Sequence, residues 1–304
     1  MQSSQAPVGY RGRFAPTPSG RLHFGSLVAA AGSYLEARSH AGEWRVRIDD
    51  IDPPRVVPGA SDEILRCLDR LGFEWDGPVV FQSRHIGAYH AALHELRQGG
   101  AIYPCGCSRS EIEAVAERGS EGPIYPGTCR SGLARDRRAR AWRMRLEAAL
   151  IEFDDGLLGV QRLDLQRETG DFAVYRADGV YSFHLASAVD EAELGITDIV
   201  RGSDLLESSA RQIYLLSLLH RPAPRYVHLP VAIDTTGAKL SKQSGAEAVN
   251  PAQPVQALCA VMRFLNQPIP AKLEHASLEQ FWEHAIEHWD LSRVGARRSA
   301  PAPR

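Results

Sequence analysis

Hydrophobic and polar positions along residues 10–100 alternate between strand-like and helix-like spacing. Short apolar runs typical of strands are RGRFA (11–15), EWRVRIDDI (43–51) and PVVF (78–81). Helical spacing follows at 22–37, 60–73 and 87–100, and the last of these patterns ends at glycine. A strand–helix alternation of this kind favours parallel strands covered by helices, so the pattern predicts an α/β fold.

The alternation stops at residue 101 and resumes near residue 186, which indicates an insertion. Within the insertion, DDG (154–156) and ADG (177–179) predict the turns of two hairpins. Afterwards GITDIVRG (195–202) predicts a strand, 203–220 a helix capped by Ser203, and RYVHLPVAI (225–233) a strand. The tail is predicted to be mostly helical and to end in a disordered segment, 295–304. The expected units are residues 10–100 and 186–245 as two halves of one domain, 101–185 as the insertion, and 246–304 as the tail.

Composition narrows the class of protein. The chain has 304 residues, is 44% hydrophobic, and carries a formal net charge of −2, as an ordinary globular protein would. It has no apolar run of membrane-spanning length and no visible secretory signal, and its five cysteines are an odd number. We therefore expect a cytoplasmic, reduced protein without a membrane partner, and a monomer.

One segment departs from this balanced charge. Residues 130–145 carry seven arginines against one aspartate. Such a run either binds nucleic-acid phosphates or forms a solvated face or mobile loop, and the sequence leaves both alternatives open.

The stretch PSGRLHFGS (18–26) joins the first strand to the first helix. Pro16 and Pro18 exclude helix and force extended backbone before them, so His23, Gly25 and Ser26 fall at the helix N-terminus. The first amides of a helix have no partner within it, and they form a ready site for anions. The alternative is an ordinary connection between a strand and a helix.

Lysine usage marks a second stretch that suits phosphate. Only three of the 35 basic residues are lysines, at positions 239, 242 and 272, and two of them lie in KLSKQ (239–243). A lysine ammonium acts on phosphate as a movable point charge, whereas arginine imposes a planar fork. A polar loop with two solvated lysines is the other interpretation.

Three cysteines, Cys105, Cys107 and Cys129, lie within 25 positions of each other. Thiolates at this spacing suit Zn²⁺, which takes four ligands, and no histidine lies within the cluster to complete the set. The residues alone therefore predict a zinc site whose fourth ligand is unidentified, and buried or redox-active cysteines are the alternative.

These stretches together resemble a known family. PSGRLHFGS resembles the HIGH signature of class I aminoacyl-tRNA synthetases, and KLSKQ resembles their KMSKS signature. RFAPTPSG, RIDDID and GITDIVRGSDLL narrow the resemblance to the glutamyl-tRNA synthetase catalytic core over roughly residues 10–245. Only about 60 residues follow KLSK, so the chain resembles the shortened glutamyl-Q tRNA(Asp) synthetase family.

The resemblance implies both a fold and a reaction. The fold would be a Rossmann-like (HUP-type) parallel sheet, split by a zinc-containing insertion and followed by a short helical tail. The reaction would be activation of L-glutamate by ATP with Mg²⁺, without tRNA. Glutamate would then pass to the queuosine base in the anticodon loop of tRNA(Asp). The alternatives are a truncated glutamyl-tRNA synthetase that charges the tRNA 3′ end and a non-catalytic RNA-binding paralogue.

The resemblance also assigns residues to substrates. His23 and Lys242 would stabilise charge on the reacting phosphate. The expected ATP-binding residues are His23, Gly25, Lys239 and Lys242. Arg13 and Arg201 would bind the side-chain carboxylate of glutamate, and Asp49 would bind its ammonium beside Ala15 and Thr17.

Two positions of this chain differ from the family, and the resemblance also supplies a candidate for the fourth zinc ligand. The family commonly has Glu where this chain has Asp49, and Tyr where it has Phe183. Tyr181 lies on the same face as Phe183 if the backbone is extended, and would then supply the missing hydroxyl. The resemblance makes Tyr125 the fourth ligand of a structural zinc, together with Cys105, Cys107 and Cys129.

Overall fold

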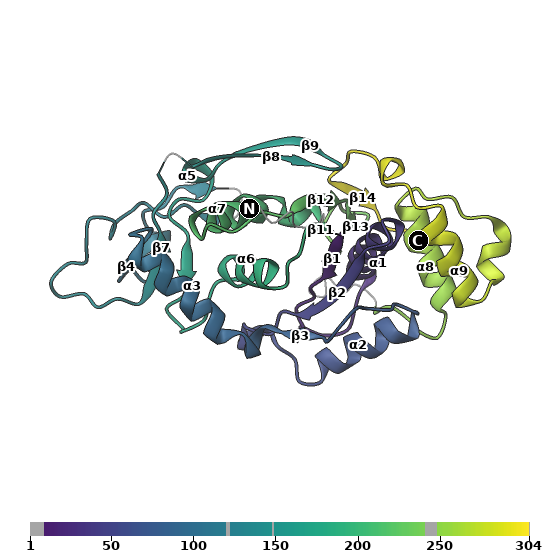
Figure 1. Cartoon of the computed structure of the whole chain (residues 1–304). Helices are drawn as coiled ribbons and strands as arrows, with labels where there is room; N and C mark the ends of the chain where they lie inside the picture. The colour runs from purple at the N-terminus through teal and green to yellow at the C-terminus, as the bar shows by residue number, and fades with distance from the viewer. Residues whose placement is uncertain (1–8, 120–121, 148, 241–247, 304) are drawn as a thin grey trace, which may run out of the picture.

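The computed structural model describes residues 9–119, 122–147, 149–240 and 248–303. Its centre is a parallel sheet in two halves, one ordered β1-β2-β3 and one pairing β11 with β12 (Figure 1). The Thr197 amide, directly before β11, donates to the Arg11 carbonyl of β1 at 3.0 Å and so joins the halves. The bounds are β1 (Arg11–Phe14), β2 (Glu43–Ile48), β3 (Val80–Phe81), β11 (Asp198–Gly202) and β12 (Arg225–Leu229). The predicted parallel α/β sheet is confirmed.

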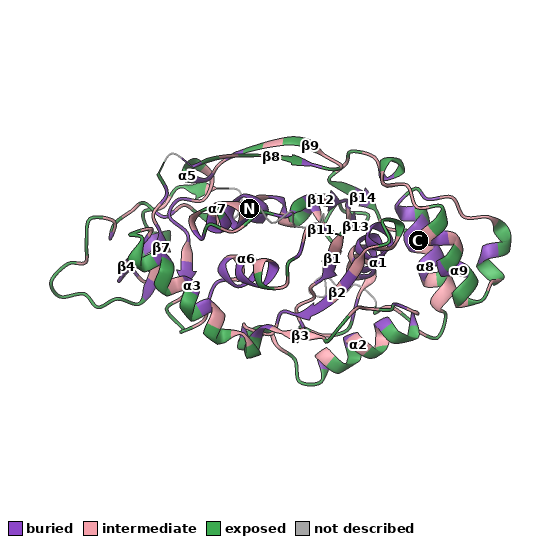
Figure 2. Ribbon diagram, viewed as in Figure 1, coloured by how far each residue is buried: buried purple, intermediate pink, exposed green. Residues whose placement is uncertain are grey.

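Helix α1 (Phe24–Ser39) runs through the core, because buried residues occupy every side of it between Leu27 and Ala37 (Figure 2). A Cβ on Gly32 would lie 2.4 Å from Leu229 Cδ1, so only glycine lets α1 come this close to the end of β12. The other helices of this part of the chain have their bounds at α2 (Ala60–Arg70), α3 (Ile86–Gln98), α6 (Phe183–Glu193) and α7 (Leu206–Leu218), with the 3₁₀ helices η1 (Pro53–Arg55), η2 (Gln82–Arg84) and η3 (Ser203–Leu205).

The insertion and the C-terminal helices lie at opposite ends of the molecule (Figure 1). In the tail, the indole Nε1 of Trp282 donates to the Leu71 carbonyl at 2.9 Å, and its ring lies 4.8 Å from that of Tyr34 on α1. The tail is therefore part of the main core. Its elements are α8 (Pro254–Phe264), η5 (Ala271–His275), α9 (Leu278–Glu287), η6 (Leu291–Val294) and β14 (Ser299–Pro301).

The insertion contains a small antiparallel sheet of order β10-β7-β4 and a long hairpin, β8–β9. The hairpin turns after Asp155, as DDG predicted, and Asp155 also pairs with Tyr226 of β12. The hairpin therefore ties the insertion to the central sheet. The bounds are β4 (Ile102–Cys105), α4 (Arg109–Glu113), β5 (Arg118–Gly119), β6 (Gly122–Pro123), β7 (Ala141–Met144), β8 (Leu150–Asp155), β9 (Gly159–Asp164), α5 (Leu165–Glu168) and β10 (Ala173–Tyr175).

The second predicted hairpin forms only as a turn. Gly179 has φ +84°, and Arg176 donates to the Val180 carbonyl at 2.9 Å, so ADG does reverse the chain. Beyond the turn a single bridge joins Tyr181 to Tyr175, and α6 begins at Phe183. The condition set above for Tyr181 therefore holds only in part: the backbone is extended at Tyr181 and Ser182, and it becomes helical at Phe183.

Three expectations about local secondary structure are wrong, each for an identifiable reason. Ser203 does not cap the following helix; it begins η3, and its hydroxyl donates to the Arg298 carbonyl at 2.5 Å. RYVHLPVAI forms two strands, β12 and β13 (Val231–Ile233), because Pro230 lacks the amide that one continuous strand needs. The expected disordered end contains β14, which pairs in parallel with β13 and buries Ala300.

Candidate active site

The predicted helix N-terminus after the first strand is confirmed. His23 is the N-cap of α1, and its Nδ1 accepts from the Ser26 amide at 3.3 Å, so the neutral ring carries its proton on Nε2. The two prolines fix the turn from the other side, because the Pro16 carbonyl accepts from the Asp49 amide at 3.0 Å. The turn is thus held against the carboxyl end of β2.

The structure brings the KLSKQ stretch to this helix N-terminus. A Cβ on Gly25 would lie 3.2 Å from the His23 ring and 3.9 Å from the Leu240 carbonyl oxygen. On the far side of KLSKQ, Ala248 forms a bridge with His23, and the Val249 amide donates to the Leu22 carbonyl at 2.9 Å. Both flanks of 241–247 therefore contact the His23 turn. Lys242 itself lies outside the described residues.

Lys239 lies at the start of the same stretch. Its Nζ contacts Asp204 Oδ2 at 2.5 Å, and both side chains are partly exposed. Asp204 follows β11 by two residues, so this ion pair holds the KLSKQ stretch to the carboxyl end of the second half-sheet. An ATP phosphate at Lys239 would compete with Asp204 for the ammonium.

Arg201 lies near the carboxyl end of β11, and its side chain is buried. Its Nη2 donates to Ser209 Oγ at 2.6 Å and to the Leu205 carbonyl at 3.2 Å, and its guanidinium lies 5.3 Å from the centre of the Tyr226 ring. Its Nη1 is buried without a hydrogen-bond partner among the described residues. Burial lowers the pKa of Arg201 to about 10, and the positive charge of Arg13 adds to this effect. A carboxylate ligand would satisfy both the unpaired nitrogen and the charge.

A buried chain of hydrogen bonds supports Arg201 from behind. Ser209 Oγ, which accepts from Arg201, lies 3.0 Å from His228 Nε2, and His228 Nδ1 lies 2.6 Å from Asp155 Oδ2. Burial lowers the pKa of His228, while the hydrogen bond from His228 holds the pKa of Asp155 below its usual range against its own burial. A neutral His228 therefore donates to Asp155 and accepts from Ser209.

This order of serine, histidine and aspartate matches a hydrolase triad, but its environment excludes nucleophilic attack. His228 and Ser209 are fully buried, and Arg201 donates into the serine oxygen. A nucleophile needs an open path to its substrate and a lone pair that is not already engaged. The chain of hydrogen bonds therefore fixes the orientation of Arg201.

Arg13 and Asp49 belong to a second buried network, centred on Glu191 of α6. Arg13 Nε donates to both oxygens of Glu191, at 2.9 and 3.1 Å, and Arg47 Nη1 lies 3.2 Å from the same carboxylate. Although burial opposes it, the charges of Arg13 and Arg47 keep the pKa of Glu191 below its usual range. Glu191 thus stays ionised and holds Arg13 by its Nε.

Asp49 is engaged by a neighbour on its own strand. Arg47 Nε donates to Asp49 Oδ1 at 2.7 Å, and burial raises the pKa of Asp49 to about 6. An ammonium bound at Asp49 would share this carboxylate with Arg47. Ala15 and Thr17 are half-buried in the turn next to it.

The two aromatic positions that depart from the family lie in different settings. Tyr181 is buried, and its ring lies 5.7 Å from Tyr89 and 5.1 Å from Tyr175. Phe183 is half-buried at the first turn of α6, with its ring 5.6 Å from His184. Ser182 between them is extended (φ −67°, ψ 151°) and Phe183 begins α6, so a substrate role for Tyr181 stays a prediction.

The predicted cysteine cluster is assembled at the start of the insertion. The Sγ atoms of Cys105, Cys107 and Cys129 all lie within 4.8 Å of one another and are buried, a geometry that can hold a metal ion. Tyr125 OH lies 3.3 Å from Cys105 Sγ and 3.6 Å from Cys107 Sγ, and it accepts from the Cys129 amide at 2.9 Å. Four potential ligand atoms therefore converge, which fits a closed site.

Sequence reasoning missed Asp155, Ser209, His228 and Glu191. One signal was available, because charged or imidazole side chains at buried positions of predicted strands and helices need a partner. His228 in YVHLP and Glu191 in AVDEAE were such positions. Their partners lie far away in sequence, so the pairing could not be predicted.

We expect Asp155→Asn to raise the KM for glutamate about tenfold in ATP–pyrophosphate exchange, with little change in the KM for ATP. The amide NH₂ would face the Nδ1–H of His228, and relief of that clash would turn the ring away from Ser209. Asp154→Asn, on the exposed face of the same strand, is the matched control. If both variants behave alike, or if KM for both substrates rises together, the chain of hydrogen bonds does not position Arg201.

Comparisons with known proteins place this geometry in a family. Residues 10–258 match the family described as tRNA synthetases class I (E and Q), catalytic domain. The chain belongs to this family of class I tRNA synthetases, and it is accordingly a ligase. Two solved structures share the fold: a glutamate tRNA ligase from Elizabethkingia meningosepticum (TM-score 0.79, 23% identity) and a glutamate-tRNA synthetase from Elizabethkingia anophelis (TM-score 0.78, 24% identity). Each match covers 97% of this chain, and 67% and 68% of the two solved chains, respectively.

Curated relatives carry a more specific name. A glutamyl-Q tRNA(Asp) synthetase from Aromatoleum aromaticum is 51% identical over 296 residues, covering 97% of this chain and 93% of its own length. A protein of the same name from Chromobacterium violaceum is 51% identical over 287 residues, covering 94% of this chain and 96% of its own length.

In the part of the chain that the structure describes, no helix combines the length and apolarity needed to cross a membrane.

Proposed function

We propose that this chain activates L-glutamate with ATP and transfers it to the queuosine base in the anticodon loop of tRNA(Asp). The observation that carries the proposal is the 51% identity, over nearly the whole chain, to relatives named for this activity. The convergence of Arg13, Arg201 and the His23 turn on the carboxyl edge of one sheet supports it.

In the first step, the α-carboxylate of glutamate attacks the α-phosphorus of ATP, an acyl phosphate bond forms, and pyrophosphate leaves. Positive and N–H donors that face the phosphate stabilise the charge that builds up there. We assign this role to His23, whose neutral ring carries its proton on Nε2, and to Lys242. Gly25 and Lys239 complete the nucleotide side, and ATP is bound with Mg²⁺.

Glutamate itself requires two cationic groups and one acidic group. Arg201, with its unpaired buried Nη1, and Arg13, held by Glu191, bind the side-chain carboxylate. Asp49 receives the ammonium, with Ala15 and Thr17 beside it. In the second step a hydroxyl of queuosine attacks the activated carbonyl. An ester forms, the bond to phosphate breaks, AMP leaves, and the hydroxyl proton passes to the leaving phosphate or to water.

The metal at the cysteine cluster is proposed to be a structural Zn²⁺ held by Cys105, Cys107, Cys129 and Tyr125. Three thiols and one phenol oxygen match the donor types and the number of ligands that zinc takes. With four protein ligands the site leaves no open position for a substrate. The ion would therefore hold the start of the insertion together and take no part in the reaction.

One experiment distinguishes transfer to queuosine from transfer to the tRNA 3′ end: labelling of tRNA from cells with and without queuosine. We expect labelled glutamate to enter tRNA from queuosine-containing cells and not tRNA from queuosine-free cells, because the acceptor hydroxyl is absent from the latter. Equal labelling of both, with the label on the terminal adenosine, would favour a truncated synthetase that charges the 3′ end. Absence of ATP–pyrophosphate exchange with glutamate would favour a non-catalytic RNA-binding paralogue.

A further inference from the structure

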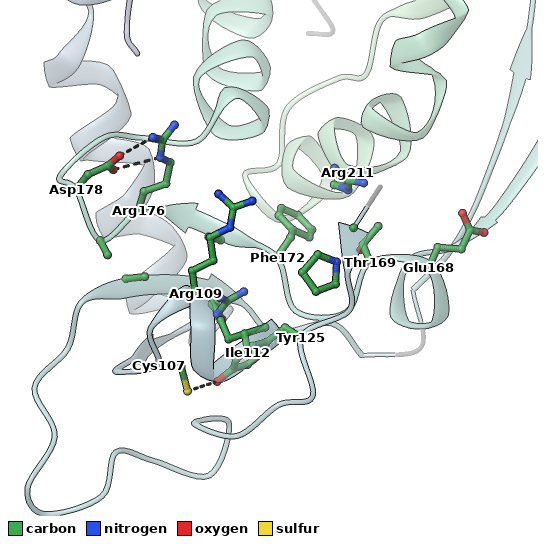
Figure 3. A pocket seen from close by; sticks show the side chains of 16 residues that line it. Cys107, Arg109, Ile112, Tyr125, Glu168, Thr169, Phe172, Arg176, Asp178 and Arg211 are labelled. Atoms are coloured by element: carbon green, nitrogen blue, oxygen red, sulfur yellow. Dashed lines mark hydrogen bonds and ion pairs between the residues drawn. The ribbon is translucent and has the colours of Figure 1, made fainter. Parts of the chain in front are cut away.

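A cavity of about 500 Å³ opens between Cys107 of the cysteine cluster, the turn at 176–178 and Arg211 of α7. Its floor includes Tyr125 and Phe172, and charged side chains surround it (Figure 3). The charged lining residues are four arginines, Arg109, Arg143, Arg176 and Arg211, and two acids, Glu168 and Asp178. Cavities of this volume are typical of small-ligand sites, and the excess of arginine favours an anionic ligand.

Acids in and beside the cavity pair with two of these arginines, Arg109 and Arg176. Arg176 is paired with Asp178 at 2.5 Å, and it also reaches Asp52 at 3.2 Å. Arg143 lies over the Tyr125 ring at 3.8 Å, and its Nε is buried with no hydrogen-bond partner in the described part of the chain. Arg109 stands on the rim with its side chain 90% exposed, in an ion pair with Glu113. An anion entering the cavity would therefore find a buried donor at Arg143, and it would compete with acids for Arg109 and Arg176.

The cavity shares a wall with the proposed glutamate site. Arg211 Nη1 lies 2.8 Å from His184 Nε2, and Phe172 packs against the same imidazole with ring centres 5.8 Å apart. His184 is half-buried in the first turn of α6, the helix whose Glu191 also holds Arg13 of the proposed glutamate site. Asp52, the partner of Arg176, follows Asp49 by three residues. A strand of RNA that brings one nucleotide to the glutamate would thus bring a neighbouring one here.

We propose that this cavity binds a nucleotide of the RNA strand adjacent to the one that receives glutamate, with its phosphate toward the arginines. The proposal rests on the proposed function, since it takes the RNA to be the acceptor. Bases in a loop are unstacked and can enter a protein cavity, and phosphates bind arginine independently of sequence. The contact would hold the acceptor strand while leaving the choice of the modified base to the glutamate site.

Three variants probe the cavity by different physical means. Arg109→Gln removes one charge from the rim, Ala177→Trp fills the mouth from the exposed turn, and Glu168→Gln removes an opposing acid. The probe is the anticodon stem-loop of tRNA(Asp), with and without queuosine, in binding by fluorescence anisotropy at two salt concentrations. We expect Arg109→Gln and Ala177→Trp each to weaken binding of both stem-loops about tenfold, and Glu168→Gln to tighten it. Arg109→Gln should also reduce the salt slope by about 0.7.

Matched controls lie on the β8–β9 hairpin. Arg162→Gln removes an exposed, paired arginine, and Val160→Trp adds an exposed indole, both away from the cavity. Controls and cavity variants alike should keep wild-type ATP–pyrophosphate exchange, which needs no RNA. Cavity variants that bind the stem-loops like wild type, or that bind no worse than the controls, would overturn the proposal. So would loss of exchange in step with loss of binding, because that pattern indicates general damage.

The outcome for the proposed function is read separately. Wild-type protein that glutamylates the queuosine stem-loop retains the function even if the cavity variants show no effect. If wild-type protein does not glutamylate the stem-loop, the proposed function is contradicted. Weaker binding of the stem-loops by the cavity variants would even then support the cavity as an RNA-binding site.

Discussion

Arg201→Lys is expected to raise the KM for glutamate by a factor of about 100 to 1,000 in ATP–pyrophosphate exchange and to leave the KM for ATP nearly unchanged. Weakening of a buried, two-pronged contact with a carboxylate costs about 3–4 kcal/mol, and about 1.4 kcal/mol is tenfold in KM, which gives that range. Lysine keeps the charge, but it lacks the planar fork that reaches both Ser209 and the substrate. The defect should therefore appear as weaker glutamate binding.

Arg225→Lys is the matched control, because Arg225 lies at the amino end of the neighbouring strand with its side chain 75% exposed. It should retain the wild-type KM for both substrates. Thermal unfolding of both variants distinguishes a substrate effect from a folding effect, since a glutamate-specific rise in KM does not follow from partial unfolding. A wild-type glutamate KM in Arg201→Lys would remove Arg201 from the site.

The parts of the site that could be predicted from sequence depend on neighbours along the chain. Pro16, Pro18 and His23 define a strand, a turn and a helix start within ten residues, and local backbone preferences decide such a junction. The cysteine cluster was visible for the same reason, because its members lie close together. The βαβ alternation predicted the parallel sheet, since parallel strands require a crossover between them.

The parts that could not be predicted depend on pairing across the fold. Asp155, Ser209 and His228 come from a hairpin, a helix and a strand that share no sequence pattern, yet their side chains form one line behind Arg201. The residues 295–303 read as disordered because they are rich in Pro, Arg and small residues. Their order comes from β13, whose free edge pairs with Ser299–Pro301. Proline is tolerated in such an edge strand at positions where the backbone nitrogen faces away from the partner strand and no N–H is needed.

The pairing of Asp49 was missed for a different reason, because its partner lies close to it in sequence. The sequence showed an acidic residue at a strand end, where a substrate ammonium would bind, and the strand end is confirmed. It did not show that Arg47, two residues earlier, already holds the carboxylate with an Nε–Oδ1 distance of 2.7 Å. Side chains at i and i+2 of a strand point to the same face, so the pair could have been proposed from spacing alone.

Cys129→Ser is expected to abolish stoichiometric zinc binding and to lower the thermal unfolding midpoint by roughly 5 °C or more. A serine hydroxyl is a much poorer ligand for zinc than a thiolate, and two thiols with one phenol oxygen do not complete the set. Metal content of protein purified under reducing, chelator-free conditions is the direct measurement. Glutamate activation should persist in part, because the cluster lies in the insertion and away from Arg13 and Arg201.

Cys259→Ser provides the control for the loss of a buried thiol. Cys259 is equally buried, but it lies in α8, outside the cluster. This variant should lose stability and keep its zinc, so metal content separates the two effects even if both variants unfold at lower temperature. Tyr125→Phe then tests the fourth ligand: it keeps the ring beneath Arg143 and removes only the hydroxyl. Weaker zinc binding in Tyr125→Phe supports coordination by the phenol oxygen, whereas unchanged zinc affinity would restrict that oxygen to hydrogen bonding and leave the fourth ligand to another group.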